Sequence, residues 1–115
     1  MMDESRKVIS EQIARYYGLE NRLFLLMEES GELVQASSKL IRTINKSECP
    51  RGEKHIRIGG LIEEIADVRC LMDEVLYLLG FDWKTVEVTM DNKYERTNRI
   101  IGEEIAADRS RMEES

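Results

Sequence analysis

The sequence predicts an all-α protein, an antiparallel bundle of about four helices. Apolar residues recur at helical spacing through most of the 115 residues, and no segment alternates strictly between apolar and polar residues. The chain has one proline, Pro50, so few and long helices are expected. Short connections between long helices favour antiparallel neighbours. We therefore predict one helical domain over residues 1–115, with a polar, frayed tail from about residue 103.

The first two predicted helices are joined by a glycine. The first covers Glu4 to Tyr17, and Gly18 is a candidate C-cap. The second covers Glu20 to Asn45. Their apolar stripes are Val8, Ile9, Ile13, Tyr16 and Tyr17 in the first helix, and Leu23, Leu26, Met27, Leu33, Ala36, Leu40 and Ile44 in the second.

A basic loop is expected next, from Lys46 to Gly60, because this stretch holds the proline and three glycines. The third predicted helix covers about Leu61 to Leu79 and ends at Gly80. Asp82 is a candidate N-cap of a fourth helix. The stripe of the third helix is Leu61, Ile65, Val68, Leu71, Met72, Val75 and Leu79, and that of the fourth is Val86, Met90, Tyr94, Thr97 and Ile101.

The composition excludes several classes of protein. The net charge of −6 argues against nucleic-acid binding and against binding to anionic membranes. The two cysteines form no CxxC pair, which is typical of reduced thiols. The N-terminal MMDESRK has no apolar signal core, and no apolar run approaches the roughly 20 residues that span a bilayer. We expect a cytoplasmic protein without a membrane segment.

Two short acidic clusters carry the chemistry of the chain. EESGE contains Glu29 and Glu32, and EEIAD contains Glu64 and Asp67. Each pair is spaced by three residues, so its carboxylates project from one helix face. The same faces carry apolar residues, and carboxylates turned toward a core are costly to bury unless a cation lies between them. The apolar residues on these lines are Leu25, Leu26 and Ala36 in the first cluster and Leu71 in the second.

A site of four carboxylates with only oxygen ligands suits Mg²⁺, with Mn²⁺ as the alternative. Antiparallel packing of the second and third helices would bring the two clusters face to face. Ile65, Val68 and Met72 would then interlock with Leu26, Leu33 and Ala36. A ferritin-like di-iron site is disfavoured because it needs two Glu-x-x-His motifs, and no Glu lies three residues before the single histidine, His55. Solvated acidic faces are the alternative interpretation of the two clusters.

Gly31 lies in the middle of the second predicted helix, between the two carboxylates of the first cluster. It costs about 1 kcal/mol relative to alanine there. We expect the close approach of a ligand or a neighbouring helix at Gly31, and a merely tolerated glycine is the alternative.

The two motifs resemble those of the MazG-like, all-α nucleoside triphosphate pyrophosphohydrolases. That superfamily includes dimeric dUTPases, dCTP pyrophosphatases and phosphoribosyl-ATP pyrophosphohydrolases, and its signature is EExxE followed by ExxD. EESGEL (28–33) matches the first part and EIADV (64–68) matches the second. The preceding GLENRL is similar to the family's helix entry, and the resemblance covers about residues 17–99.

The resemblance implies Mg²⁺-dependent cleavage between the α- and β-phosphates of a nucleoside triphosphate, giving a monophosphate and pyrophosphate. Glu29, Glu32, Glu64 and Asp67 match the metal-ligand positions. Glu28 matches the first Glu of EExxE and is the candidate for orienting the attacking water, although Glu28 and Glu29 can exchange these roles. Glu63 is one helical step off the ExxD line and is left out.

The resemblance also implies phosphate-binding, base-binding and subunit contacts. NKYERTNR (92–99) lies where the family carries phosphate ligands, but it does not keep the common Lys-x-x-x-Asn-x-x-Arg spacing. At the start of the second helix Asn21 is the candidate for hydrogen-bonding a base and Phe24 for stacking on it, with burial of Phe24 in the core as the favoured alternative. A homodimer or homotetramer is expected. The phosphate-binding candidates are Lys93, Arg96, Asn98 and Arg99, with a solvated cationic helix face as the alternative.

Two other functions stay open at this point. Phosphoribosyl-ATP hydrolysis belongs to the same superfamily and uses the same motifs. A non-enzymatic helical interaction module would keep acidic faces for solubility or for a basic partner.

Overall fold

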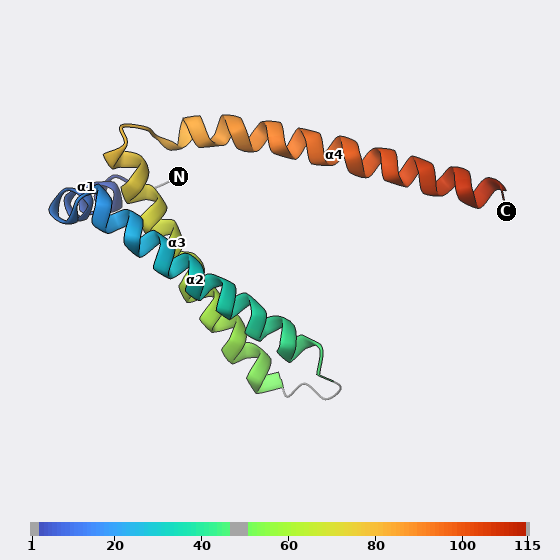
Figure 1. Ribbon diagram of the computed structural model, residues 1–115, viewed down its shortest axis with the longest axis horizontal. Coiled ribbons are helices and arrows are strands. Elements are labelled where there is room, and N and C mark those ends of the chain that lie inside the picture. Colours follow the sequence, from blue (N-terminus) through green and yellow to red (C-terminus); the bar gives the residue numbers. More distant parts are fainter. Residues whose placement is uncertain (1–2, 47–50, 115) are drawn as a thin grey trace. The chain divides into compact units, whose positions relative to one another are not determined.

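Four helices make up the computed structural model, which describes residues 3–46 and 51–114 (Figure 1). No strand is present in these two ranges, so the predicted all-α class is confirmed. None of the helices among the described residues is both long and apolar enough to cross a membrane. The helices are α1 (Glu4–Tyr17), α2 (Leu19–Ile44), α3 (Arg51–Leu78) and α4 (Trp83–Glu114).

The chain divides into two units, Met1–Phe81 and Asp82–Ser115. The first unit contains α1, α2 and α3, and the second contains α4 alone. Residues 103–114, expected to be a polar tail, continue α4 as exposed helix. The prediction of a single domain over residues 1–115 stays a prediction.

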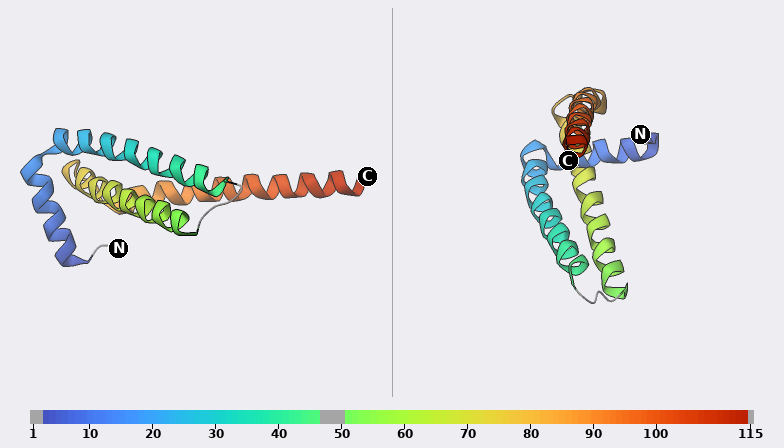
Figure 2. Two further views of the ribbon diagram at one scale, coloured as in Figure 1. Left: turned by 90° about the horizontal axis from the view of Figure 1, so that it is seen from below. Right: turned by 90° about the vertical axis from the view of Figure 1, so that its right-hand side faces the viewer.

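In the first unit, α2 and α3 form an antiparallel hairpin, as predicted (Figures 1 and 2). The chain turns sharply at Gly18, and α1 crosses the end of the hairpin, packing mainly on α3. Gly18 adopts φ of +83°, which a glycine tolerates better than any other residue. Its N–H donates to the carbonyl oxygen of Ala14, so the predicted C-cap is confirmed.

Both ends of α2, the end of α3 and the start of α4 also agree with the prediction to within one residue. The N–H of Asn45 donates to the carbonyl oxygen of Ile41, which makes Asn45 the cap of α2. Gly80 has φ of +79° directly after the last turn of α3. The side chain of Asp82 accepts a hydrogen bond from the N–H of Lys84 at 3.0 Å, so it caps the start of α4.

The predicted loop from Lys46 to Gly60 is wrong from residue 51 onward, because α3 begins at Arg51. Residues 47–50, including Pro50, lie outside the described residues. Glycines in a helix interior cost about 1 kcal/mol each, but packing along α2 offsets this cost.

Lys46 Nζ lies 2.6 Å from Glu53 Oε1, which joins the end of α2 to the first turn of α3. This charge lowers the pKa of Glu53 below its ordinary value.

The contact line between α2 and α3 follows residues spaced alternately by three and four, the repeat of a coiled-coil seam. Many of these positions carry charge, which is unusual for a seam because burying charge is costly. On α2 they are Arg22, Leu25, Glu29, Glu32, Ala36, Lys39 and Thr43; on α3 they are Arg57, Gly60, Glu64, Asp67, Leu71, Glu74 and Leu78.

The apolar core of the described residues is small. Ala14, Leu71 and Val75 are the buried hydrophobic residues there, and Ile65, predicted to interlock with α2, is 51% exposed. The prediction for Ile65 is wrong because the seam passes through Glu64 and Asp67, which turns Ile65 toward solvent. Much apolar surface of the first unit is therefore not covered by the described helices of that unit.

A buried ion pair joins α2 to α3 near the open end of the hairpin. Arg22 Nη1 donates to Glu74 Oε1 at 3.0 Å, and both side chains are less than one-tenth exposed. The same guanidinium donates twice to Asn21 Oδ1, at 3.0 and 2.7 Å. It also lies 4.3 Å from the centroid of the Tyr17 ring at the end of α1. Arg22 thus connects all three helices of the first unit.

Removing one partner of this pair should destabilise the first unit strongly. We expect Glu74→Ala or Arg22→Met to cost about 3 kcal/mol, because each leaves an uncompensated buried charge. The double variant Arg22→Met with Glu74→Leu should be closer to wild type than either single variant. Urea unfolding followed by circular dichroism measures all three. Strictly additive losses would show that the pair carries no coupling.

Candidate metal centre

Three carboxylates from two helices meet on the seam of the hairpin. Oxygen atoms of Glu29 on α2 and of Glu64 and Asp67 on α3 all lie within 4.8 Å of one another. The antiparallel packing of α2 and α3, predicted from the short connections between long helices, brings them together. Glu29 and Glu64 are half-buried and Asp67 is exposed, so the cluster opens to solvent on one side.

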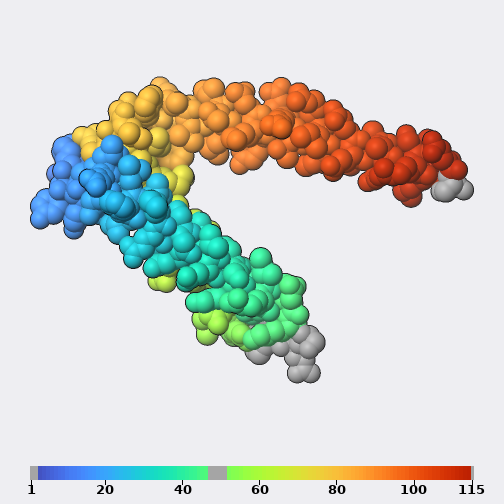
Figure 3. All heavy atoms as spheres, in the orientation of Figure 1, coloured from blue at the N-terminus to red at the C-terminus, as the bar shows by residue number. Residues whose placement is uncertain are grey.

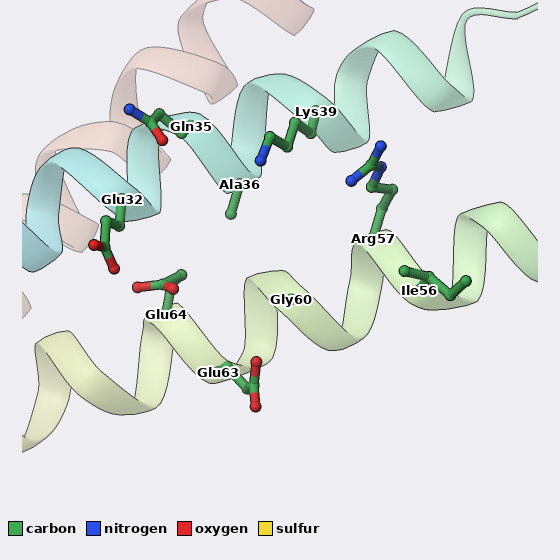
Figure 4. Close-up of a pocket in the computed structure, with 9 residues that line it drawn as sticks. All are labelled: Glu32, Gln35, Ala36, Lys39, Ile56, Arg57, Gly60, Glu63 and Glu64. Carbon is green, nitrogen blue, oxygen red and sulfur yellow. The ribbon is translucent and has the colours of Figure 1, made fainter.

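Glu32, the fourth predicted ligand, lies beside this group. It is close enough to Glu29 for a carboxyl–carboxyl hydrogen bond and for charge repulsion, both of which raise the pKa of Glu29. Figure 4 shows the carboxylates of Glu32 and Glu64 pointing toward one another across the seam. The structure therefore gathers all four predicted carboxylates, with Glu32 at the edge of the tighter trio.

Two oxygen atoms of the cluster have no hydrogen-bond partner. Glu29 Oε2 and Glu64 Oε2 are both buried and unsatisfied. A carboxylate oxygen only accepts, and its neighbours here are other carboxylates, so one of them must be protonated or a cation must lie between them. Buried polar atoms are normally paired, and these two fit the ligand positions of a hard cation.

The pKa of Glu29 also reflects the repulsion between these neighbouring carboxylates. The pKa of Glu29 rises from 4.5 to about 7, first through the neighbouring carboxyl group of Glu64, then through burial, and then through Glu32 and Asp67. Repulsion among like charges favours the neutral acid. A divalent cation would reverse this preference, because it favours the charged form of every carboxylate around it.

The donor set of the site is all oxygen. Oxygen ligands select Mg²⁺, Mn²⁺ or Ca²⁺, whereas zinc prefers nitrogen or sulfur. Cys70 borders a cavity beside Asp67, but burial and the acids around it raise the pKa of its thiol, which keeps the thiol protonated. The residues present therefore fit Mg²⁺ or Mn²⁺.

Two cavities flank the cluster along the seam. The first has a volume of about 350 Å³ and reaches from Glu32 and Glu64 to Lys39 and Arg57 (Figure 4). The second, about 260 Å³, lies on the other side, against Glu29, Asp67 and the buried ion pair of Arg22 with Glu74. A ligand bound in either cavity would touch the carboxylates.

Two other acidic residues of the motifs stand apart from the cluster. Glu28 is exposed and borders neither cavity, so its role in orienting water stays a prediction. Glu63 borders the first cavity, but its carboxylate points away from α2 (Figure 4). Its orientation agrees with leaving it out of the ligand set.

The two candidates for base binding lie at the start of α2. Asn21 is exposed, but its Oδ1 already accepts two hydrogen bonds from Arg22, which leaves the amide NH₂ to face a ligand. Phe24 is 63% exposed, so its burial in the core of this chain is wrong. Stacking of Phe24 on a base stays a prediction.

The four candidates for phosphate binding all belong to α4, in the second unit. All four side chains are exposed, and their part in the site stays a prediction. Lys93, Arg96 and Arg99 recur every third residue and share one side of the helix. Asn98 is the fourth candidate.

The sequence analysis missed two cations that lie beside the carboxylates. Lys39 follows Glu32 by seven residues and Arg57 precedes Glu64 by seven, so both continue the seam. Extending the seven-residue repeat beyond the acidic motifs would have found them. Arg57 was missed because its segment was assigned to a loop.

Gly31 is exposed, and a Cβ atom built on it meets nothing within 4 Å. Within the described part of the first unit no helix approaches Gly31, so the predicted close approach has no partner there.

No protein-family model, curated protein or solved structure matches the chain. The family resemblance is therefore carried by the two motifs and by the GLENRL segment that precedes them.

The raised pKa of Glu29 predicts how the stability of the metal-free protein depends on pH. The folded state binds this proton more tightly than the unfolded state, so stability falls as pH rises from 4.5 to about 7 and then levels off. Glu29→Gln should flatten this part of the profile, because an amide carries no titrating proton. The melting temperatures of wild type and of Glu29→Gln, measured in EDTA from about pH 5 to about pH 8, test this prediction.

Glu28→Gln is the matched control, since Glu28 is the neighbouring glutamate and is exposed. It should keep the wild-type pH profile. An unchanged profile in Glu29→Gln would show that the carboxylates do not crowd one another in solution.

Proposed function

We propose that this protein is a MazG-like nucleoside triphosphate pyrophosphohydrolase that depends on Mg²⁺. One observation carries the proposal: Glu29, Glu64 and Asp67 converge from two helices and leave two buried carboxylate oxygens unsatisfied. These residues are the ones that match the EExxE and ExxD motifs of that superfamily. A solvated acidic face would have no reason to bury such oxygens against one another.

In this proposal Glu29, Glu32, Glu64 and Asp67 hold the metal. Bound Mg²⁺ would neutralise phosphate oxygens and favour attack by water. Four carboxylates carry more charge than one divalent ion balances, so two ions, or ions shared with the substrate's phosphates, suit the site better. The hairpin positions the four ligands before substrate arrives, which lowers the entropic cost of assembling the site.

The reaction breaks the anhydride bond between the α- and β-phosphates. A water oxygen attacks the α-phosphorus, pyrophosphate leaves, and the proton of the water passes to a base. Glu28 is our candidate for that base, because it lies one residue from Glu29 and is open to solvent. The products are a nucleoside monophosphate and pyrophosphate.

Removing a metal ligand should nearly abolish the reaction. We expect Glu29→Gln and Asp67→Asn to lower turnover about a hundredfold or more, because each weakens the site that holds the cation. Incubation of the purified protein with a panel of ribo- and deoxynucleoside triphosphates and phosphoribosyl-ATP in Mg²⁺, with the products separated by ion-exchange chromatography, measures it.

Glu63→Gln is the matched control, because this glutamate belongs to the same motif but is directed away from α2 (Figure 4). It should retain wild-type turnover. Mg²⁺ should also raise the melting temperature of wild type but not of Asp67→Asn. Absence of hydrolysis across the whole panel would reject the enzyme, and absence of a Mg²⁺ effect would favour a non-enzymatic helical module.

We further propose that the protein works as a homodimer or a homotetramer. The face of α2 that is turned away from α3 carries exposed apolar residues. In Figure 3, α2 is open to view along the surface of the first unit. They follow the same three-and-four spacing as the seam, and a second helix would cover them. Gly31 lies in the middle of this outer stripe, where the absence of a side chain lets another helix come close. The outer stripe is Phe24, Met27, Gly31, Val34 and Ile41.

Charge placed in the outer stripe should dissociate the oligomer. Val34→Glu, at a position 68% exposed in this chain, should lower the mass measured by light scattering to that of one chain. Arg42→Glu, at an exposed polar position of the same helix, should leave the mass unchanged. A wild-type protein that already has the mass of one chain would reject this part of the proposal.

A further inference from the structure

The first cavity has an acidic end and a basic end. Glu32 and Glu64 lie at one end, and Lys39 and Arg57 at the other (Figure 4). Each cation is seven residues from the carboxylate on its own helix, and seven residues of α-helix rise about 10 Å. Because α2 and α3 are antiparallel, the two cations come to the same end of the cavity.

The cations are directed into the space between the helices. In Figure 4 the guanidinium of Arg57 projects from α3 toward α2, and the ammonium of Lys39 leans back toward the carboxylates. Side chains on a helix lean toward its N-terminus, which for Lys39 is the direction of Glu32. The cavity volume of about 350 Å³ falls within the range of small-molecule sites.

The guanidinium group of Arg57 lacks one of its hydrogen-bond acceptors. Its Nε is buried and has no hydrogen-bond partner among the described residues. Neither Arg57 nor Lys39 makes a salt bridge within the described part of the chain. A buried guanidinium N–H without an acceptor is costly, and a phosphate oxygen is the acceptor that its fork geometry suits best.

We infer that this cavity binds the phosphate chain of the substrate, with Lys39 and Arg57 as ligands of the phosphates that leave as pyrophosphate. The inference rests on the proposed function, because the carboxylate end must hold a cation before an anion can lie beside it. Metal at one end and two cations at the other then match a linear polyanion. This arrangement assigns phosphate binding to the hairpin itself, in addition to the candidates on α4.

Gly60 keeps the cavity open. It lies between Arg57 and Glu64 on the α3 side of the seam and borders the cavity. A Cβ atom built on Gly60 meets nothing within 4 Å, so a side chain there can begin without a clash and would extend into the cavity. Such a side chain would occupy the volume that we assign to the phosphates.

The first experiment measures the binding of inorganic pyrophosphate in Mg²⁺ by isothermal titration calorimetry. Lys39→Gln and Arg57→Gln should each weaken it on the order of tenfold, the effect of losing a charged hydrogen bond. Arg57→Lys should recover part of the affinity, because it keeps the charge but loses the planar fork. Orthophosphate should bind more weakly than pyrophosphate, because a single phosphate cannot span the cavity. Lys54→Gln, an exposed cation of the same helix, is the control and should bind as wild type does.

The second experiment uses a matched pair of glycines. Gly60→Leu should abolish pyrophosphate binding, whereas Gly59→Leu should not, because Gly59 is exposed and borders neither cavity. An added Cβ atom meets nothing within 4 Å at either position, and both variants should keep wild-type helix content by circular dichroism. Equal binding by the two variants would overturn the inference.

The outcomes separate this inference from the proposed function. Hydrolysis by wild type, with pyrophosphate affinity unchanged in Lys39→Gln and Arg57→Gln, would overturn the inference and leave the function standing. Pyrophosphate binding that these variants lose, in a protein that hydrolyses no nucleotide, would support the cavity and reject the function. Failure of wild type to bind pyrophosphate would overturn the inference whatever the hydrolysis assay shows.

Discussion

Carboxylates that face one another across a helix seam are the constraint on which this structure depends. Glu29 and Glu64 lie where a coiled coil would normally place apolar side chains, and each keeps one buried oxygen unsatisfied. Hydrophobic contact therefore cannot be what selected these residues. Either a shared proton or a bound cation must relieve the repulsion, and which one does so depends on pH and on the metal concentration.

The charges along the seam are ordered rather than scattered. At the open end of the hairpin, Arg22 and Glu74 neutralise one another in a buried pair. The acidic cluster follows, and Lys39 and Arg57 come last. The paired charges hold the helices in register, while the unpaired ones are separated by sign and border a cavity. This order favours binding a cation and a polyanion side by side, because each ligand would offset the charge that the protein leaves unbalanced.

Hydrophobic periodicity was sufficient to predict most of the fold. The ends of α1 were predicted to the residue, and Gly18, Gly80 and Asp82 were identified as caps, because these signals are local. The start of α3 was predicted ten residues too late. Local propensity penalises the glycines between residues 51 and 60, whereas the packing of α3 along α2 offsets that penalty, and packing is not a local property.

The sequence by itself determined the helical class and the four carboxylates, because a spacing of three residues fixes which side chains share a helix face. Only the tertiary structure decided what those carboxylates meet. Antiparallel pairing brought Glu29 within reach of Glu64 and Asp67, and it placed Lys39 beside Arg57 at the far end of one cavity. These contacts join residues that are 18 to 38 positions apart. Their geometry follows from the register of two helices, which no single stretch of sequence specifies.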